Sequence, residues 1–161
     1  MPDWTSLNPG GGWRQAHMGH WLRLALDRFD TRVLALMAHH PGVPLGLANL
    51  VTRGQVGAAH IHITRHLATE GSRLTDLAKS AGMSKQAMGT LVNQCEAWGM
   101  VTRAPDPLDA RAQQLRFTAV GLAWLEAYRE AVEQAELELR EAVGEEVATV
   151  LAIGLEAYSG Q

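Results

Sequence analysis

Residues 74–98 combine two short amphipathic helix patterns with a turn between them, and this spacing restricts the fold more than any other feature of the sequence. Thr75 is a candidate N-cap for the first helix, and Gly82 supplies a residue that tolerates the left-handed backbone of a tight turn. Ser84 is a favourable N-cap for a second helix over 85–98. Two helices joined by so short a turn are typical of a helix-turn-helix unit.

The second of these helices has an apolar side and a side of short polar residues, as expected for a helix that packs on a core with one face. Amides, hydroxyls and a lysine are groups that read base edges or contact phosphates in the major groove. A glycine within a helix costs about 1 kcal/mol, and we expect it here to permit close approach of DNA. The outward positions are Lys85, Gln86, Gly89, Thr90, Asn93 and Gln94.

A β-hairpin is predicted directly after the second helix. Short strand patterns cover 100–104 and 113–117, and the prolines and aspartates between them mark a turn. A hairpin in this position is a wing. Arg111, near its tip, is placed to enter a minor groove, where narrow width concentrates negative potential, and we expect Asp109 to hold Arg111 in place.

The run from residue 74 to 121 resembles the MarR family of bacterial regulators. The resemblance lies in Leu-Thr-Asp-Leu-Ala from residue 74, Met-Ser-Lys-Gln from residue 83, Glu-Ala-Trp-Gly-Met-Val-Thr-Arg from residue 96, Asp-Pro-Leu-Asp-Ala-Arg from residue 106, and Phe-Thr-x-x-Gly from residue 117. It implies sequence-specific binding of a double-stranded DNA operator. By resemblance Lys85, Gln86, Thr90 and Asn93 face the groove, and Arg111 lies on the wing. The expected DNA-contacting set also includes Thr75, Ser84, Gly89, Gln94 and Arg103.

Three helices are expected before the helix-turn-helix unit. Apolar residues recur every three or four positions over 16–40, which predicts one long helix. A short helix follows over 44–52, because Pro44 suits a first helical turn. A third helix is expected over 55–69, with Gly71 as its C-cap.

Two helices are expected after the hairpin. Thr118 can cap a long helix that extends to about residue 142, and a final amphipathic helix follows Gly144. A seam of apolar residues in the long helix predicts helix–helix contact: Leu125, Tyr128, Val132, Ala135 and Leu139. In the MarR family the first and last helices of two subunits intertwine. The resemblance therefore implies a homodimer whose reading helices lie about 34 Å apart on a palindromic operator.

The expected fold class is mainly α with a small β-hairpin wing, comprising a winged helix-turn-helix domain and a helical dimerisation region. An N-terminal extension over 1–15 precedes N-terminal dimerisation helices over 16–54. The winged helix-turn-helix DNA-binding domain covers 55–118, and C-terminal dimerisation helices cover 119–161.

Charge is distributed unevenly over these parts. Residues 72–118 contain six basic and four acidic side chains, whereas residues 119–161 contain two basic and nine acidic ones. The net charge of −3 therefore originates in the acidic C-terminal helices. The mildly basic middle of the chain is compatible with a nucleic-acid partner.

Histidines indicate an alternative function. His62 and His66 are four residues apart on one predicted helix, so they share a face and can hold a metal together with a third ligand. A regulator that senses a metal ion through His62 and His66 is therefore an alternative function. With Trp21, the same histidines are candidates for the binding site of a small-molecule effector in a ligand-responsive repressor. A winged-helix protein-interaction module without DNA binding is the other alternative.

Neither an enzyme, a cofactor nor a membrane partner is expected. The sequence holds no glycine-rich phosphate loop, nucleophile elbow or paired-carboxylate setting, and no window approaches the roughly 18 apolar residues of a membrane span. The single cysteine, Cys95, cannot form an intrachain disulfide, which favours a reducing cytoplasm. Nothing basic adjoins it, so we interpret it as a buried structural residue rather than a peroxide sensor.

Overall fold

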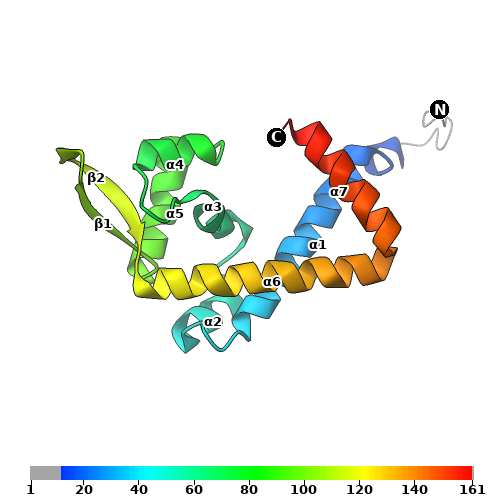
Figure 1. Ribbon diagram of the computed structural model, residues 1–161, viewed down its shortest axis with the longest axis horizontal. Coiled ribbons are helices and arrows are strands. Elements are labelled where there is room, and N and C mark those ends of the chain that lie inside the picture. Colours follow the sequence, from blue (N-terminus) through cyan, green and yellow to red (C-terminus); the bar gives the residue numbers. More distant parts are fainter. Residues whose placement is uncertain (1–11, 161) are drawn as a thin grey trace.

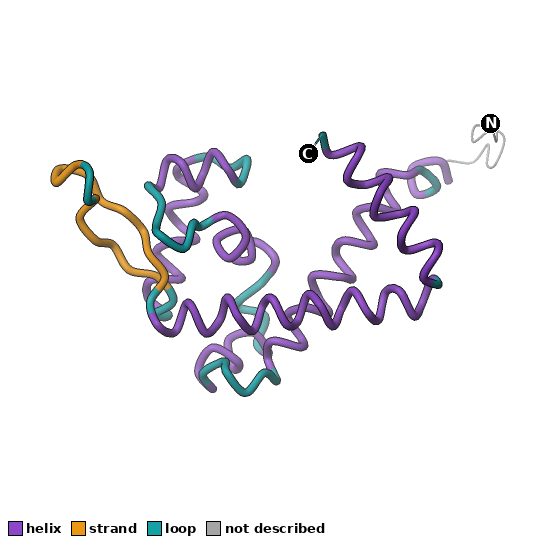
Figure 2. The backbone as a smooth tube through the Cα atoms, viewed as in Figure 1, coloured by secondary structure: helices purple, strands orange, loops and turns teal. Residues whose placement is uncertain are grey.

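Helix α6 runs lengthwise across the molecule and connects two groups of elements (Figure 1). One group holds α3, α4, α5 and a β-hairpin, and the other holds α7 and the start of α1. In this computed structural model, residues 12–160 are described. The elements are a 3₁₀ turn at Gly12–Gln15, α1 Met18–Ala38, α2 Leu45–Thr52, α3 Ala58–His66, α4 Leu74–Ser80, α5 Lys85–Ala97, β1 Val101–Asp106, β2 Asp109–Phe117, α6 Ala119–Val143 and α7 Glu145–Ser159. The tube view in Figure 2 shows that the hairpin is the only strand structure within this range.

The helix-turn-helix unit forms as the sequence predicts. Gly82 adopts a φ of +64°, in the left-handed region that glycine tolerates. Ser84 caps α5, because its hydroxyl accepts a hydrogen bond of 3.1 Å from the backbone N–H of Ala87. Met88, Val92 and Cys95 on the inner side of α5 are fully buried. Their burial fixes which side of α5 faces outward.

The wing is longer than expected. β1 and β2 pair in antiparallel register from Val101 opposite Phe117 to Asp106 opposite Asp109, and only Pro107 and Leu108 remain in the turn. Val101 and Phe117 are buried at the base of the hairpin. The prediction of strands over 100–104 and 113–117 was therefore too short, because backbone pairing continues through residues that sequence patterns assign to a loop.

Trp124 attaches α6 to the winged domain. Its ring is 1% exposed, and its indole N–H donates a hydrogen bond of 3.0 Å to the hydroxyl of Thr64 on α3. Thr118 caps α6 as predicted, accepting from the N–H of Gly121 at 3.0 Å. Gly121 itself faces the backbone of Met100, and a β-carbon there would overlap the Met100 carbonyl oxygen. These contacts hold the start of α6 against the wing.

Small residues bring α1 and α6 together. Ala127, Ala131 and Ala135 are buried along one side of α6, and the pairing is supported by two hydrogen bonds of 2.7 Å from Arg32 to Glu138. The bonds from Arg32 hold the pKa of Glu138 at about 2, well below its usual value. The predicted seam of larger residues was only partly right, because its members Tyr128 and Val132 flank the alanine line and are half-buried.

Three local predictions were wrong. Helix α3 is shorter than the predicted 55–69 and ends at His66. Gly71, the predicted C-cap, lies beyond that end with a φ of +107° and packs against the side chain of Gln114. Helix α4 begins after Arg73, so Thr75 lies inside the helix and is not its N-cap.

Among the described residues, none of the helices combines the length and the apolar character that crossing a membrane requires.

Candidate nucleic-acid interface

The outward side of α5 presents polar side chains at its N-terminal end. Lys85 and Gln86 are exposed, and within residues 12–160 neither side chain forms a hydrogen bond or ion pair with another. Thr90 is exposed as well, and its hydroxyl donates to the backbone carbonyl of Gln86 at 3.2 Å. This end of the helix can therefore offer a cation, an amide and a hydroxyl oxygen to a partner.

Three other predicted site residues, Gly89, Ser84 and Thr75, lie in this region. Gly89 is half-buried, and a β-carbon there would make ordinary contact with Leu74 of α4 at 3.8 Å. The glycine thus lies next to α4, and the contact leaves room for a larger residue. The hydroxyl of Ser84 is occupied by its capping bond to Ala87. Thr75 is exposed on α4.

The wing tip is stiffened by acidic side chains. Asp106 is buried and accepts hydrogen bonds from Arg73 at 2.6 Å and from the backbone N–H of Leu108 at 2.8 Å. The bond from Leu108 and that from Arg73 together lower the pKa of Asp106. Asp109 accepts from the backbone N–H of Arg111 at 3.1 Å. Asp109 thus fixes the backbone of Arg111 rather than its guanidinium group, which has no partner in the part of the chain that the structure describes.

The side chain of Arg103, another predicted DNA-contacting residue, is paired within the protein. Its guanidinium pairs with the carboxylate of Glu96 and donates a bond of 2.8 Å to the amide oxygen of Asn93. Both partners are on α5, so Arg103 connects the first wing strand to the C-terminal half of that helix. The signal in the sequence that could have indicated this pairing is the opposite charge of residues 96 and 103 across a short helix–strand connection.

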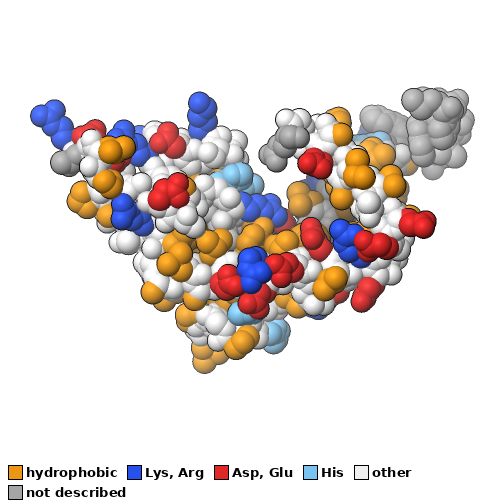
Figure 3. Space-filling view, in the orientation of Figure 1, with side chains coloured by type: hydrophobic (Ala, Val, Ile, Leu, Met, Phe, Trp, Pro, Cys, Tyr) orange, Lys and Arg blue, Asp and Glu red, His pale blue; other side chains and the backbone are white. Residues whose placement is uncertain are grey.

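Charges are segregated on the molecular surface. Lys and Arg side chains project at the outer end of the hairpin and above α4, whereas acidic side chains gather over α6 and α7 (Figure 3). This arrangement agrees with the charge distribution along the sequence. It leaves the winged end of the molecule as the favourable side for a polyanion.

A polar joint links the winged domain to α1 and α6. Arg65 on α3 donates to the buried carboxylate of Asp30 on α1 at 2.7 Å and to the hydroxyl of Tyr128 on α6 at 2.9 Å. Because Asp30 is buried, removing its arginine partner would leave an unpaired charge. One guanidinium therefore fixes the relative position of three helices.

His62 and His66 lie side by side on α3, with ring centroids 6.1 Å apart. Burial, followed by the nearby charges of His62 and Arg65, lowers the pKa of His66. The Nδ1 atom of His62 is buried and has no hydrogen-bond partner among the described residues. Residues 12–160 contain no group of three His, Cys, Asp or Glu side chains arranged to hold a metal ion, so the third ligand that the metal hypothesis needs was not found there.

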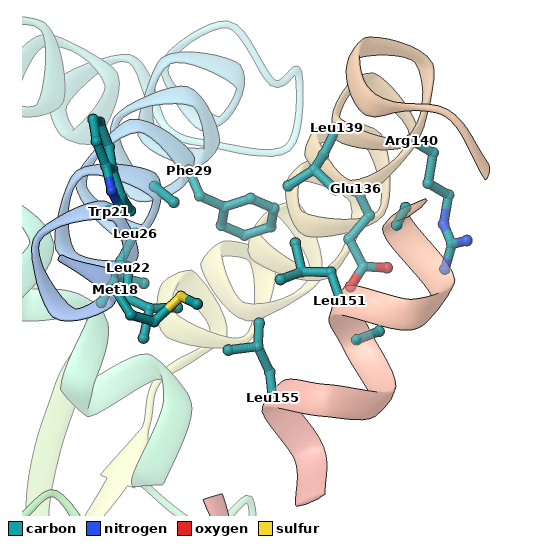
Figure 4. A pocket seen from close by; sticks show the side chains of 13 residues that line it. Met18, Trp21, Leu22, Leu26, Phe29, Glu136, Leu139, Arg140, Leu151 and Leu155 are labelled. Carbon is teal, nitrogen blue, oxygen red and sulfur yellow. The ribbon is translucent and has the colours of Figure 1, made fainter. Parts of the chain in front are cut away.

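An apolar groove of about 530 Å³ opens between α1, α6 and α7. Figure 4 shows Phe29 and Leu151 pointing into it, with Trp21 at one edge. Neither His62 nor His66 lines this groove. The three predicted effector-binding residues therefore do not form a single pocket here.

Cys95 will not react with thiol reagents in the folded protein. It is 0% exposed, and burial raises the pKa of its thiol to about 12, so almost no thiolate is present at neutral pH. Labelling with iodoacetamide, followed by mass spectrometry, should give modification only in denaturant. Rapid labelling of the native protein would contradict the buried placement of α5's inner side.

The capped helix pair, outward polar face and stiff wing define a winged helix-turn-helix protein. Residues 55–112 match the sequence profile of the MarR family. This match covers most of the winged part of the chain, and the resemblance to the MarR family seen in the sequence is confirmed for that part. A comparison with curated proteins finds no match.

Solved structures share the fold over most of the chain. The transcriptional repressor CouR bound to a 23-mer DNA duplex is 21% identical, with a TM-score of 0.67 over 92% of this chain and 96% of CouR. CouR from Rhodococcus jostii with p-coumaroyl-CoA is 20% identical, with a TM-score of 0.62 over 88% of this chain and 90% of that one. Apo MarR from E. coli is 19% identical, with a TM-score of 0.62 over 88% and 96%. The mainly helical fold with a hairpin wing is thereby confirmed.

Proposed function

We propose that this chain is a transcription regulator that binds a palindromic DNA operator as a homodimer and has no catalytic role. The observation that carries the proposal is the exposed N-terminal end of α5, where the side chains of Lys85 and Gln86 have no partner among the described residues. Beside it lies a stiffened wing whose Arg111 guanidinium also has no partner there. A DNA-bound structure of the similar repressor CouR supports the same use of the fold. The reducing cytoplasm is the proposed compartment, consistent with a buried free thiol.

The operator should contain two half-sites. In a two-fold dimer the two α5 helices would enter successive major grooves, about 34 Å or one helical turn apart. Footprinting on duplexes from the gene's own neighbourhood should therefore protect two related half-sites with that spacing. Absence of binding to every such duplex would favour the protein-interaction module over the DNA reader.

The proposed dimerisation regions are residues 16–54 and 119–161. Helix α7 is apolar on two sides: Leu151 and Leu155 line the groove, whereas Val150 and Ile153 are 72% and 61% exposed on the other side. A helix that is apolar nearly all round is normally buried. We propose that a second copy of this chain covers the outer side of α7 and the groove.

A charge on the outer side of α7 should dissociate the dimer. In Val150→Glu each subunit would bury an unpaired carboxylate at the proposed interface, which costs several kcal/mol. Size-exclusion chromatography with light scattering should give a mass near 35 kDa, twice that of one chain, for the unaltered protein and near 17.5 kDa for the variant. Gln113→Glu, an exposed position on the wing, is the matched control and should remain dimeric. A dimeric Val150→Glu variant would place the interface elsewhere.

We also propose that a small-molecule effector controls DNA binding from the region between α1 and the winged domain. The buried, unpartnered Nδ1 of His62 supports this, because a buried polar atom without a partner is uncommon and a ligand group can satisfy it. Arg65 links α3 to α1 and α6, and an effector that favours one arrangement of these helices would change the distance between the two α5 helices of the dimer. Screening aromatic acids and aromatic acyl-CoA esters by thermal shift should find a stabilising ligand whose effect is lost in His62→Phe. A ligand shift that survives in this variant would exclude His62 from the site.

A further inference from the structure

Two adjacent amide side chains on α5 are each held by a hydrogen-bond donor from a different neighbouring element. The guanidinium of Arg103 on β1 lies 2.8 Å from Oδ1 of Asn93. The imidazole Nε2 of His60 on α3 lies 2.9 Å from Oε1 of Gln94. Asn93 and Gln94 are both exposed, so these bonds act on side chains that a partner can reach.

The orientation of both amides follows from the chemistry of their partners. A guanidinium has only donors, so Asn93 must turn its oxygen, and not its nitrogen, towards Arg103. The Nδ1 atom of His60 accepts a bond of 3.1 Å from the backbone N–H of Gly57. In the neutral ring this places the proton on Nε2. Gln94 must therefore also turn its oxygen inward, towards His60.

Neither donor is free to move away. The ring of His60 is buried and packs on Trp98 of α5, with centroids 4.9 Å apart. The other arm of the Arg103 guanidinium is engaged by Glu96, one turn further along α5. With each amide oxygen directed inward, the NH₂ group of each amide is the end that remains available on the outside.

We propose that Arg103 and His60 are positioning residues that make Asn93 and Gln94 hydrogen-bond donors towards DNA. The inference rests on the proposed DNA-binding function and adds a chemical preference to it. Amide NH₂ groups recognise acceptors, which are phosphate oxygens, guanine O6 and N7, adenine N7, and thymine O4. The bidentate pairing of an amide with adenine also needs the amide oxygen to accept from adenine N6, and that oxygen is directed inward here.

The first arm of the test uses the full-length protein without DNA. Nitrogen-15 relaxation of side-chain NH₂ groups should find Asn93 and Gln94 rigid, whereas Gln86, an exposed amide without a partner, should be mobile. Arg103→Ala should make the side chain of Asn93 mobile and leave that of Gln94 rigid. In Arg103→Lys, which keeps a hydrogen-bond donor, the side chain of Asn93 should be rigid again. If Asn93 and Gln94 in the unaltered protein are as mobile as Gln86, the inference is overturned. Because this comparison uses the unaltered protein alone, it does not depend on whether a variant of the buried His60 folds.

The second arm selects binding sequences from a randomised duplex pool with the unaltered protein, Asn93→Asp and Gln94→Glu. Each acidic variant keeps an oxygen for its partner but lacks the outward N–H. We expect each variant to bind DNA at least about tenfold more weakly. If the amide contacts a base, the variant should also lose a preference for guanine or thymine. If the amide contacts a phosphate, the base preference should not change. Loss of a preference for adenine over guanine, which requires the amide oxygen, or unchanged affinity, would overturn the inference. If the unaltered protein enriches no sequence, the proposed function fails. Rigid amides in the first arm would then still show that Arg103 and His60 hold Asn93 and Gln94 in place.

Discussion

Replacing Trp124 with alanine will lower the free energy of unfolding by about 3–5 kcal/mol, the range for deleting a large buried aromatic side chain. Trp124 is 1% exposed and lies where α6 meets α3. Its removal leaves a cavity and also leaves the buried hydroxyl of Thr64 without its donor. Chemical denaturation at fixed protein concentration measures the loss, because the stability of a dimer depends on concentration.

Two further variants separate the contributions at this position. Trp124→Phe keeps most of the ring volume but removes the indole N–H, so it should cost about 1–3 kcal/mol from the unsatisfied Thr64 hydroxyl and the smaller ring. Leu122→Ala, at an exposed neighbour on α6, should change stability by less than about 0.5 kcal/mol. A loss below about 1 kcal/mol in Trp124→Ala would contradict the role of Trp124 as the anchor of α6.

Replacing Arg111 with alanine will weaken operator binding at least about tenfold without unfolding the protein. Arg111 is exposed near the wing tip, and only its backbone is engaged, by Asp109. A dimer carries two wings, so the variant loses two cations. The slope of log K against log salt concentration should become shallower by about 1.8, at about 0.9 for each phosphate contact.

Arg103 and Arg28 supply the comparisons for this experiment. Arg103→Ala should weaken binding with little change in salt slope, because its guanidinium is engaged by Glu96 and Asn93 rather than by phosphate. Arg28→Ala, at an exposed position on α1, should change neither quantity. Wild-type affinity in Arg111→Ala would show that the wing assignment is wrong.

The helix-turn-helix unit was predictable because its signals are local. The cap at Ser84 and the left-handed turn at Gly82 depend on residues that adjoin each other in sequence, and both predictions are confirmed. The exposed outer side of α5 follows from the same periodicity. The longer wing was missed because backbone pairing between strands is not encoded in side-chain pattern alone.

The roles of several residues depend on distant partners and were not predictable. Arg103 was expected to contact DNA, and its pairing with Asn93 became visible only once β1 was placed beside α5. Of the alanine line on α6, the predicted seam included only Ala135. Ala127 and Ala131 were missed, because the close approach of α1 that favours small side chains is not visible in the sequence. The groove beside Trp21 requires α1, α6 and α7 to meet, which periodicity within any single helix does not specify.

The salt dependence of binding to a duplex from the gene's own promoter region tests the central claim most directly. We predict two chains bound to each duplex, with log K falling linearly against log salt concentration at a slope of about −3.6 or steeper, because each of the two subunits offers at least Lys85 and Arg111 to phosphates. Binding that is absent at low salt, or that is insensitive to salt, would contradict the assignment of this chain as a dimeric DNA-binding regulator.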